Sequence, residues 1–274
     1  MTVAIVVANF NTCRLIAQLV FSLYRLLGRD QFSELVVVDN ASSDGSRELL
    51  AALHRSGLIH LIQNRTQRYH GPALTQGVSW LASACPGVDY VWVLDSDMVI
   101  LRADTVRDAL AAARAVDAVA AGQKLDDSGY NRLLRHNSEM LDPCSLIFDL
   151  RRVWRSSIPP FLEDGAPATA LQVAVDAEGL RLVDFPFVEA EYLVHVGRGT
   201  LRELARSGDT ANRYYEWALG HQEPHFGGHE RGADLYRDFS DHFDTEVGEL
   251  TPANLVDAIG RGAAAETVAP AIHP

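Results

Sequence analysis

Two hydrophobic periodicities alternate through the first half of this chain, and their alternation constrains the fold more than any other feature. Short, continuous apolar runs rich in Val and Ile fall at residues 3–8, 35–38, 58–62, 90–94 and 118–121. Such runs are typical of strands buried on both faces of a sheet. Helical patterns separate them, at residues 14–27, 46–55, 72–84 and 105–115. The alternation predicts an α/β fold with an open, mostly parallel sheet covered on both sides.

The second half of the chain is less regular. The pattern predicts a strand at 145–150, a helix at 169–177 and a strand at 190–195. Beyond residue 200 the chain becomes polar and helical, and residues 260–274 form an Ala- and Pro-rich end that we expect to be a loosely held tail. No linker is evident, so residues 1–200 are predicted to form one domain with a C-terminal helical extension and tail over 201–274.

Charge and cysteine content exclude several classes of partner. The 24 Lys and Arg residues against 36 Asp and Glu residues give a net charge of −12, which argues against nucleic acid as a partner. The three cysteines are odd in number and form no CxxC pair, which predicts a reducing, cytoplasmic location. No apolar run approaches 18 residues, so we expect no transmembrane segment and at most peripheral membrane contact.

Several well-known fingerprints are missing. Gly197 and Gly199 begin a GxGxxG pattern, but Arg202 stands where its last glycine belongs. No P-loop, HExxH or GxSxG sequence occurs. These absences disfavour a dinucleotide-dependent dehydrogenase, a P-loop NTPase and an α/β-hydrolase.

Polar side chains follow three of the predicted strands. In open α/β sheets, ligands bind beyond the carboxyl ends of the strands, so these positions are where chemistry is expected. They are Asn9 and Asn11, Asp39 and Asn40, and Asp95-Ser96-Asp97. Two carboxylates two residues apart can serve one Mg²⁺ or Mn²⁺ ion, which would neutralise a diphosphate. A turn in which an aspartate caps the next element is the alternative.

These segments together resemble the family-2 glycosyltransferases, which have the GT-A fold. The similarity lies in Asn9-Phe10-Asn11, in residues 36–46 (VVVDNASSDGS), in Asn64 with His70-Gly71-Pro72-Ala73, and in residues 90–97 (YVWVLDSD). It is good over residues 1–125 and patchy to about 200. The resemblance implies a mixed sheet with a Rossmann-like nucleotide-sugar-binding half at 1–125 and an acceptor half at 126–200.

The resemblance also implies an activity, which is metal-dependent transfer of a sugar from a nucleotide-sugar, a UDP-sugar favoured, to an acceptor hydroxyl or amine, with inversion. Mn²⁺ or Mg²⁺ is the expected cofactor. The resemblance also implies roles for individual residues. Asp39 bonds the base, and Asn9 and Ser42 line the nucleoside pocket. Asp95 approaches the ribose or the sugar, and Asp95 and Asp97 hold the metal. The other residues implied to lie around the donor are Asn11, Asn64, His70, Gly71 and Ser96.

A second segment supports the same site. His195 ends an apolar run and precedes Val196-Gly197-Arg198-Gly199-Thr200, which is similar to a His-x-Gly stretch of the family. The resemblance implies that His195 reaches the metal and that Arg198 adds positive charge at the pyrophosphate. A histidine with a purely structural role at a strand end is the alternative.

An inverting transfer needs a base to take the proton of the acceptor. Glu163 and Asp164 precede a helical stretch, like the acidic pair that supplies the base in the family, and Asp164 is the preferred candidate; an exposed loop pair is the alternative. Two other functions stay open. One is a nucleotide-sugar-binding module without turnover, and the other is a sugar-phosphate nucleotidyltransferase, which residues 8–12 disfavour because they lack a Gly-rich basic loop.

Overall fold

A computed structural model describes residues 1–125, 140–162, 167–207, 215–221 and 223–265 of the chain. Seven strands form one sheet in the order β3-β2-β1-β4-β7-β6-β8. The strands are β1 (Val3–Asn9), β2 (Glu34–Asp39), β3 (His60–Gln63), β4 (Tyr90–Asp95), β6 (Ala118–Lys124), β7 (Leu141–Asp149) and β8 (Arg181–Asp184). Only β7 runs antiparallel to its neighbours, so the predicted mixed and mostly parallel sheet is confirmed.

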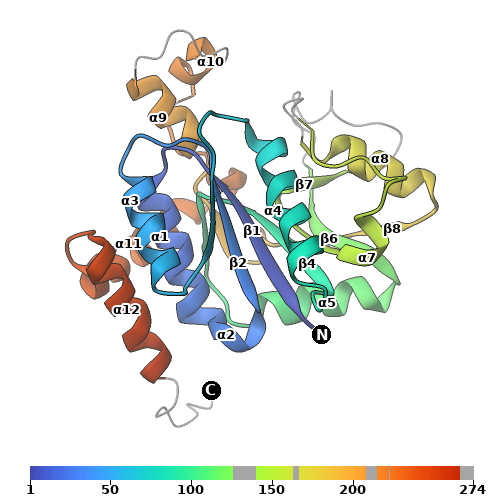
Figure 1. The fold of residues 1–274 in the computed structure, drawn as a ribbon, viewed down its shortest axis with the longest axis horizontal. Helices are drawn as coiled ribbons and strands as arrows, with labels where there is room; N and C mark the ends of the chain where they lie inside the picture. The colour runs from blue at the N-terminus through green and yellow to red at the C-terminus, as the bar shows by residue number, and fades with distance from the viewer. Residues whose placement is uncertain (126–139, 163–166, 208–214, 222, 266–274) are drawn as a thin grey trace.

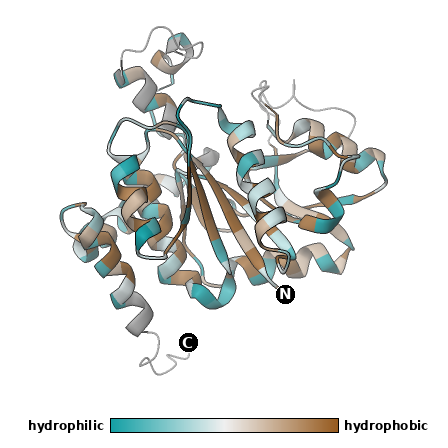
Figure 2. Cartoon of the chain, in the orientation of Figure 1, coloured by the Kyte–Doolittle hydropathy of each residue, from teal (hydrophilic) through white to brown (hydrophobic). Residues whose placement is uncertain are grey.

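The central strands are buried on both faces, as their continuous apolar runs predict. Ile5 and Val7 belong to the core on one face, and Val6 belongs to the core on the other. Helices α1 (Cys13–Ser22), α3 (Ser46–Arg55) and α5 (Thr105–Ala115) supply apolar side chains to the first core, and α4 (His70–Ala84) and α8 (Thr169–Ala177) supply the second. Figures 1 and 2 show the resulting three layers, with the apolar strands between helices whose outer faces are polar.

Helix α4 lies unusually close to β1. A Cβ built at Gly77 would lie 2.5 Å from Val6 Cγ1, so only glycine allows this approach. The helix begins at His70, two residues before the start predicted from Pro72. Pro72 is still in the first turn, where backbone N–H groups need no partner within the helix. The close packing fixes the start of α4 beside the carboxyl ends of the strands.

The C-terminal helices are part of the packed molecule. They are α9 (Gly199–Ser207), α10 (Tyr215–Leu219), α11 (Gly232–Val247) and α12 (Pro252–Ala265). Phe243 of α11 is fully buried and meets the ring of Phe21 edge-on, with centroids 5.4 Å apart. Arg14 of α1 donates to Asp244 at 2.8 Å. The expected tail is wrong over 260–265, which are helical because α12 buries Leu255, Ala258 and Ile259 against this core.

Several short elements were not predicted from the sequence. Strands β5 (Met98–Ile100) and β9 (Leu193–His195) pair antiparallel in a small second sheet. They are three residues long, so they carry little periodic signal, and the strand expected at 190–195 is correspondingly shorter. The remaining elements are a π-helical turn (Leu23–Leu27), α2 (Gly28–Gln31), α7 (Leu150–Val153) and a 3₁₀ turn (Phe226–Gly228). No helix in the described ranges has both the length and the apolarity to cross a membrane.

Candidate functional site

The three predicted strand ends meet at one edge of the sheet. The pairing of β1 with β2 sets Asn9 beside Asp39, and the pairing of β1 with β4 sets Ala8 beside Asp95. Strands β2 and β4 lie on opposite sides of β1, so the chain changes direction across the sheet here. This kind of switch point is where open α/β sheets bind ligands.

A buried hydrogen-bond network fixes the loops above β1 and β2. Asn9 Nδ2 donates to Asp39 Oδ1 at 3.2 Å and to Ser42 Oγ at 3.1 Å. Asn9 Oδ1 accepts from Thr12 Oγ1 at 2.7 Å, and Ser42 Oγ also accepts from the Asn11 backbone N–H at 3.0 Å. The network therefore brings together four of the residues predicted to bind the donor, namely Asn9, Asn11, Asp39 and Ser42.

The environment of Asp39 differs from that of an open ligand contact. Its side chain is 0% exposed, and its carboxylate accepts bonds from Asn9 and from the Ser42 backbone N–H. Arg47 Nε lies 3.9 Å from Asp39 Oδ2 and is half exposed, so it covers this carboxylate on the solvent side. In this structure Asp39 joins the loops that follow β1 and β2.

Asn64 bonds Asn40, which was predicted only as a polar residue at the end of a strand. Asn64 Nδ2 donates to Asn40 Oδ1 at 3.0 Å, and Asn40 Nδ2 donates to the Tyr69 carbonyl at 2.8 Å. Tyr69 has φ of +62° and directly precedes α4. Asn40 and Asn64 thereby support the backbone turn that presents His70.

Two histidines converge on the Asp95-Ser96-Asp97 segment. His70 Nε2 lies 3.1 Å from Asp95 Oδ1. His195 Nε2 lies 3.3 Å from Asp97 Oδ1 and 3.8 Å from Asp95 Oδ2. The pairing of β5 with β9 explains this arrangement, because it sets His195 opposite Met98, the residue after Asp97. Ser96 is tied to the nucleoside side of the site by a 2.9 Å bond with Thr12.

The charges of this group compensate one another. Burial lowers the pKa of His195, but the Asp97 and Asp95 carboxylates outweigh it and raise that pKa to about 9. Burial also lowers the pKa of His70, but the Asp95 carboxylate outweighs this effect and raises that pKa above its ordinary value. Burial raises the pKa of Asp95, whereas His70 and His195 bring it below its ordinary value. The two imidazoles therefore favour ionised carboxylates at this edge.

The residues present fit a divalent cation. Asp95 Oδ1 is buried and has no hydrogen-bond partner among the described residues, although His70 Nε2 lies 3.1 Å away as an ion-pair contact. One carboxylate oxygen of Asp95, one nitrogen of His195 and the sulfur of Cys144 lie within 4.8 Å of one another. Carboxylate and imidazole are ligands that divalent metals accept in proteins. Nothing in the sequence pattern singled out Cys144, because only the pairing of β7 with β4 brings it here.

Asp97 is held by the start of α9. Its Oδ2 accepts the Gly199 backbone N–H at 2.9 Å, and the residue is 7% exposed. Arg198, expected at the pyrophosphate, has φ of +59° and directs Nη1 to the Glu223 carbonyl at 3.5 Å. The structure thus brings Asp95, Asp97 and His195 together and gives Arg198 a different contact.

Glu163 and Asp164 lie outside the described residues, but the chain on either side of them is well anchored. Thr75 Oγ1 of α4 donates to the Phe161 carbonyl at 2.9 Å. A Cβ on Gly71 would lie 1.9 Å from the Leu162 carbonyl oxygen, so Gly71 permits a close contact that no other residue allows. The Leu162 N–H donates to the Pro167 carbonyl at 3.0 Å. Residue 162 is thereby fixed beside the start of α4, next to His70.

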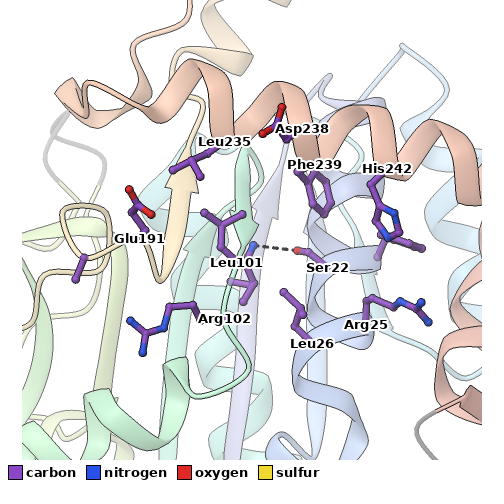
Figure 3. A pocket seen from close by; sticks show the side chains of 13 residues that line it. Ser22, Arg25, Leu26, Leu101, Arg102, Glu191, Leu235, Asp238, Phe239 and His242 are labelled. Carbon is purple, nitrogen blue, oxygen red and sulfur yellow. Dashed lines mark hydrogen bonds between the residues drawn. The ribbon is translucent and has the colours of Figure 1, made fainter. Parts of the chain in front are cut away.

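A separate cavity of about 570 Å³ lies beyond the opposite end of the small β5–β9 sheet (Figure 3). Its walls come from α1, the π-helical turn and α11, and Ser22 Oγ accepts the Ile100 backbone N–H at 3.1 Å at its base. Leu26, Leu101 and Phe239 give it apolar surface. It marks the seam between α11 and the core, away from the strand-end site.

Comparison with known proteins gives a match to one family of transferases. The profile of the family described as Glycosyl transferase family 2 matches residues 4–183. A search of curated proteins found no match.

Solved structures share the fold at low identity. Mannosyltransferase PcManGT from Pyrobaculum calidifontis, in complex with GDP-Man and Mn²⁺, is 18% identical over 98% of this chain and 76% of its own, with a TM-score of 0.55. S. aureus TarS 1–349 in complex with UDP-GlcNAc is 16% identical over 96% and 80%, with a TM-score of 0.52. Glucosyl-3-phosphoglycerate synthase from Mycobacterium tuberculosis, in complex with Mn²⁺, UDP and phosphoglyceric acid, is 18% identical over 67% of each chain, with a TM-score of 0.51.

Proposed function

Because this chain belongs to glycosyl transferase family 2 and has the GT-A fold, we propose that it transfers a sugar from a nucleotide-sugar to an acceptor hydroxyl or amine, with inversion and with a divalent cation. The observation that carries the proposal is the convergence of Asp95, Asp97 and His195 at the carboxyl edge of the sheet. A UDP-sugar is the favoured donor. Solved structures of similar fold hold GDP-Man or UDP-GlcNAc, so both nucleotides belong in any test.

The donor half of the site is assigned from the strand-end network. Asn9, Asn11, Asp39 and Ser42 are proposed to surround the nucleoside, with Asp39 as the base contact after Arg47 has moved aside. Asn64, His70, Gly71 and Ser96 are proposed to lie beneath the diphosphate and sugar. Arg198 would turn from the Glu223 carbonyl to the pyrophosphate. These assignments draw support from burial and from the shared network, which preorganises the polar groups.

Asp95, Asp97 and His195 are the proposed residues for Mn²⁺ or Mg²⁺. When bound, such a cation supplies positive charge that stabilises the nucleoside diphosphate leaving group without proton transfer. Asp97 also keeps its bond to Gly199, so the proposed ligand is oriented by the start of α9. The spacing of one Asp95 carboxylate oxygen, one His195 nitrogen and the Cys144 sulfur, all within 4.8 Å of one another, supports a cation at this position.

Asp164, or Glu163 beside it, is the proposed base for the acceptor proton. Gly71 and Thr75 support this proposal, because they hold residues 161 and 162 against α4, whose first residue contacts Asp95.

The free state of all three cysteines supports a reducing cytoplasm as the location.

A donor panel tests the proposal. UDP- and GDP-sugars are added with and without Mn²⁺. The melting temperature of the protein and the release of nucleotide are measured in separate samples. A true donor should raise the melting temperature only with Mn²⁺ and should give slow release of UDP or GDP. Binding without any release would indicate a binding module, and release of pyrophosphate from a nucleoside triphosphate with a sugar phosphate would indicate a nucleotidyltransferase. Failure of every donor to bind would overturn the assignment.

A further inference from the structure

We propose that Cys144 is a direct ligand of the cation at this site, which adds a sulfur atom to the proposed Mn²⁺ or Mg²⁺ site and lets it also bind thiophilic divalent ions such as Co²⁺. The inference rests on the proposed cation dependence and names a further ligand for it. It follows from the position of one thiol among a carboxylate and an imidazole, contributed by β7, β4 and β9.

The register of the sheet puts Cys144 at the metal-binding edge. Antiparallel β4 and β7 pair Leu94 with Ser145, so Asp95 and Cys144 are the next residues across the same pair. Side chains opposite each other on antiparallel strands have Cβ atoms about 4.5–5.5 Å apart. A second contact fixes the end of β7, because the Cys144 backbone N–H donates to Asp142 Oδ1 at 2.9 Å. The thiol is thus held toward Asp95 by backbone geometry.

The spacing of the three ligand atoms suits one ion. They lie within 4.8 Å of one another. Around a tetrahedral ion, with bonds of about 2.3 Å to sulfur and about 2.0–2.1 Å to nitrogen or oxygen, ligand atoms are separated by roughly 3.5 Å. A separation of 4.8 Å exceeds this value by about 1.3 Å, which small rotations of the two side chains concerned supply. The other ion-pair contacts of the cluster, His195 Nε2 at 3.8 Å from Asp95 Oδ2 and 3.3 Å from Asp97 Oδ1, place a second carboxylate beside the same three atoms.

The donor atoms around the thiol suit more than one divalent ion. The sulfur of Cys144 lies within 4.8 Å of a carboxylate oxygen of Asp95 and a nitrogen of His195. A cation held here would take the place of the thiol proton, which would leave to water. Carboxylate oxygens suit Mn²⁺ and Mg²⁺, whereas a thiolate and an imidazole suit Co²⁺ and Zn²⁺. The mixed oxygen, nitrogen and sulfur set therefore admits Co²⁺ as a probe of the same site.

Spectroscopy with cobalt tests directly whether Cys144 is a ligand. Co²⁺ is titrated into the protein, and the sulfur-to-cobalt charge-transfer absorption is recorded in the near ultraviolet. The wild-type protein should develop this band. Cys144→Ser should lose it while still binding Co²⁺, roughly tenfold more weakly. Cys85→Ser is the matched control and should keep the band, since Cys85 lies at the far end of α4, about 22 Å along the helix axis from His70.

A second variant keeps the test decisive if Cys144→Ser does not fold. The chain has three cysteines, so Cys13→Ser combined with Cys85→Ser leaves Cys144 as its sole thiol. Its cobalt complex should show the full band. A saturated cobalt complex without the band in this variant would overturn the inference, as would an undiminished band in Cys144→Ser.

The result also separates this inference from the proposed function. If Co²⁺ binds without a sulfur band while Mn²⁺ still supports donor turnover, the thiol ligand is wrong and the glycosyltransferase assignment stands. If turnover is independent of every divalent ion and neither Co²⁺ nor Mn²⁺ binds, the cation site itself is wrong, and the thiol ligand fails with it. Mn²⁺ binding is followed by its electron paramagnetic resonance signal with UDP present.

Discussion

Asp97 accepts a hydrogen bond from the backbone N–H of Gly199 at 2.9 Å, although the two residues are separated by about a hundred positions in the chain. The bond joins the segment after β4 to the first residue of α9. Because a helix N-terminus carries partial positive charge, it stabilises the Asp97 carboxylate at this position. Figure 1 shows α9 lying beyond the carboxyl ends of β1 and β2, so this contact couples the C-terminal helices to the site.

Gly199→Ala should damage both the site and the fold around it. A Cβ at this position would lie 2.7 Å from Leu15 Cδ1 and 3.1 Å from Asp97 Oδ2, so α9 or Asp97 has to shift. We expect the free energy of unfolding to fall by about 1–3 kcal/mol and donor turnover to fall at least tenfold. Gly87→Ala is the control, because a Cβ there meets nothing within 4 Å. Equal behaviour of the two variants in chemical denaturation and turnover would contradict the argument.

Asp97→Asn separates charge from hydrogen bonding at the same position. The amide oxygen can still accept from Gly199, but the variant has no negative charge for a cation or for His195, which lies 3.3 Å away. We expect kcat to fall by about 10²–10³, with a small change in melting temperature. Asp117→Asn, at an exposed carboxylate paired with Arg152, should leave kcat unchanged. Turnover by Asp97→Asn within twofold of the wild-type rate would remove Asp97 from the reaction.

The contrast between local and long-range features explains what the sequence could predict. Asn9, Asp39 and Asp95 follow buried runs of Val and Ile, so the strands, their order of appearance and their polar ends were readable from adjacent residues. His195 was placed at a strand end by the apolar run before it, but its role at the metal came from a resemblance to a family. Its closeness to Asp97 depends on the pairing of β9 with β5, which no local pattern encodes.

Other features depended on contacts between distant segments. Cys144 reaches the cluster through the register of an antiparallel pair, and Asn40 bonds partners more than twenty residues away. The polar, helical character of the last seventy residues was evident, but the burial of Phe243 against α1 was not. Such contacts arise from tertiary packing, which amphipathic spacing indicates without naming the partner.

Asp39→Ala should lower stability as well as donor affinity. The carboxylate accepts bonds from Asn9 Nδ2 and from the Ser42 backbone N–H in a fully buried position, and its removal leaves these donors short of a partner. We expect the free energy of unfolding to fall by about 1–3 kcal/mol, measured by urea denaturation. Asp30→Ala, at an exposed position, should change it by less than about 0.5 kcal/mol. Unaltered stability of Asp39→Ala would show that the network is dispensable to the fold.

Phe243→Ala tests whether the C-terminal helices are integral to the domain. The ring is fully buried between Phe21 and Phe239, so its truncation leaves a cavity in the main core. We expect a loss of about 3–5 kcal/mol in the free energy of unfolding. Asp244→Ala, which removes only the exposed ion pair with Arg14, should cost about 0–1 kcal/mol. A single cooperative transition for both variants would agree with one packed unit, and a separate early transition for Phe243→Ala would contradict it.

Asp164→Asn should slow the chemical step without loosening the donor. If Asp164 takes the acceptor proton, kcat should fall by about 10²–10⁴ while the donor Kd is unchanged, measured by single-turnover kinetics and calorimetry. Glu163→Gln is the matched control, and a greater loss in that variant would move the role to Glu163. Full activity in both Asp164→Asn and Glu163→Gln would mean that the base comes from another part of the chain.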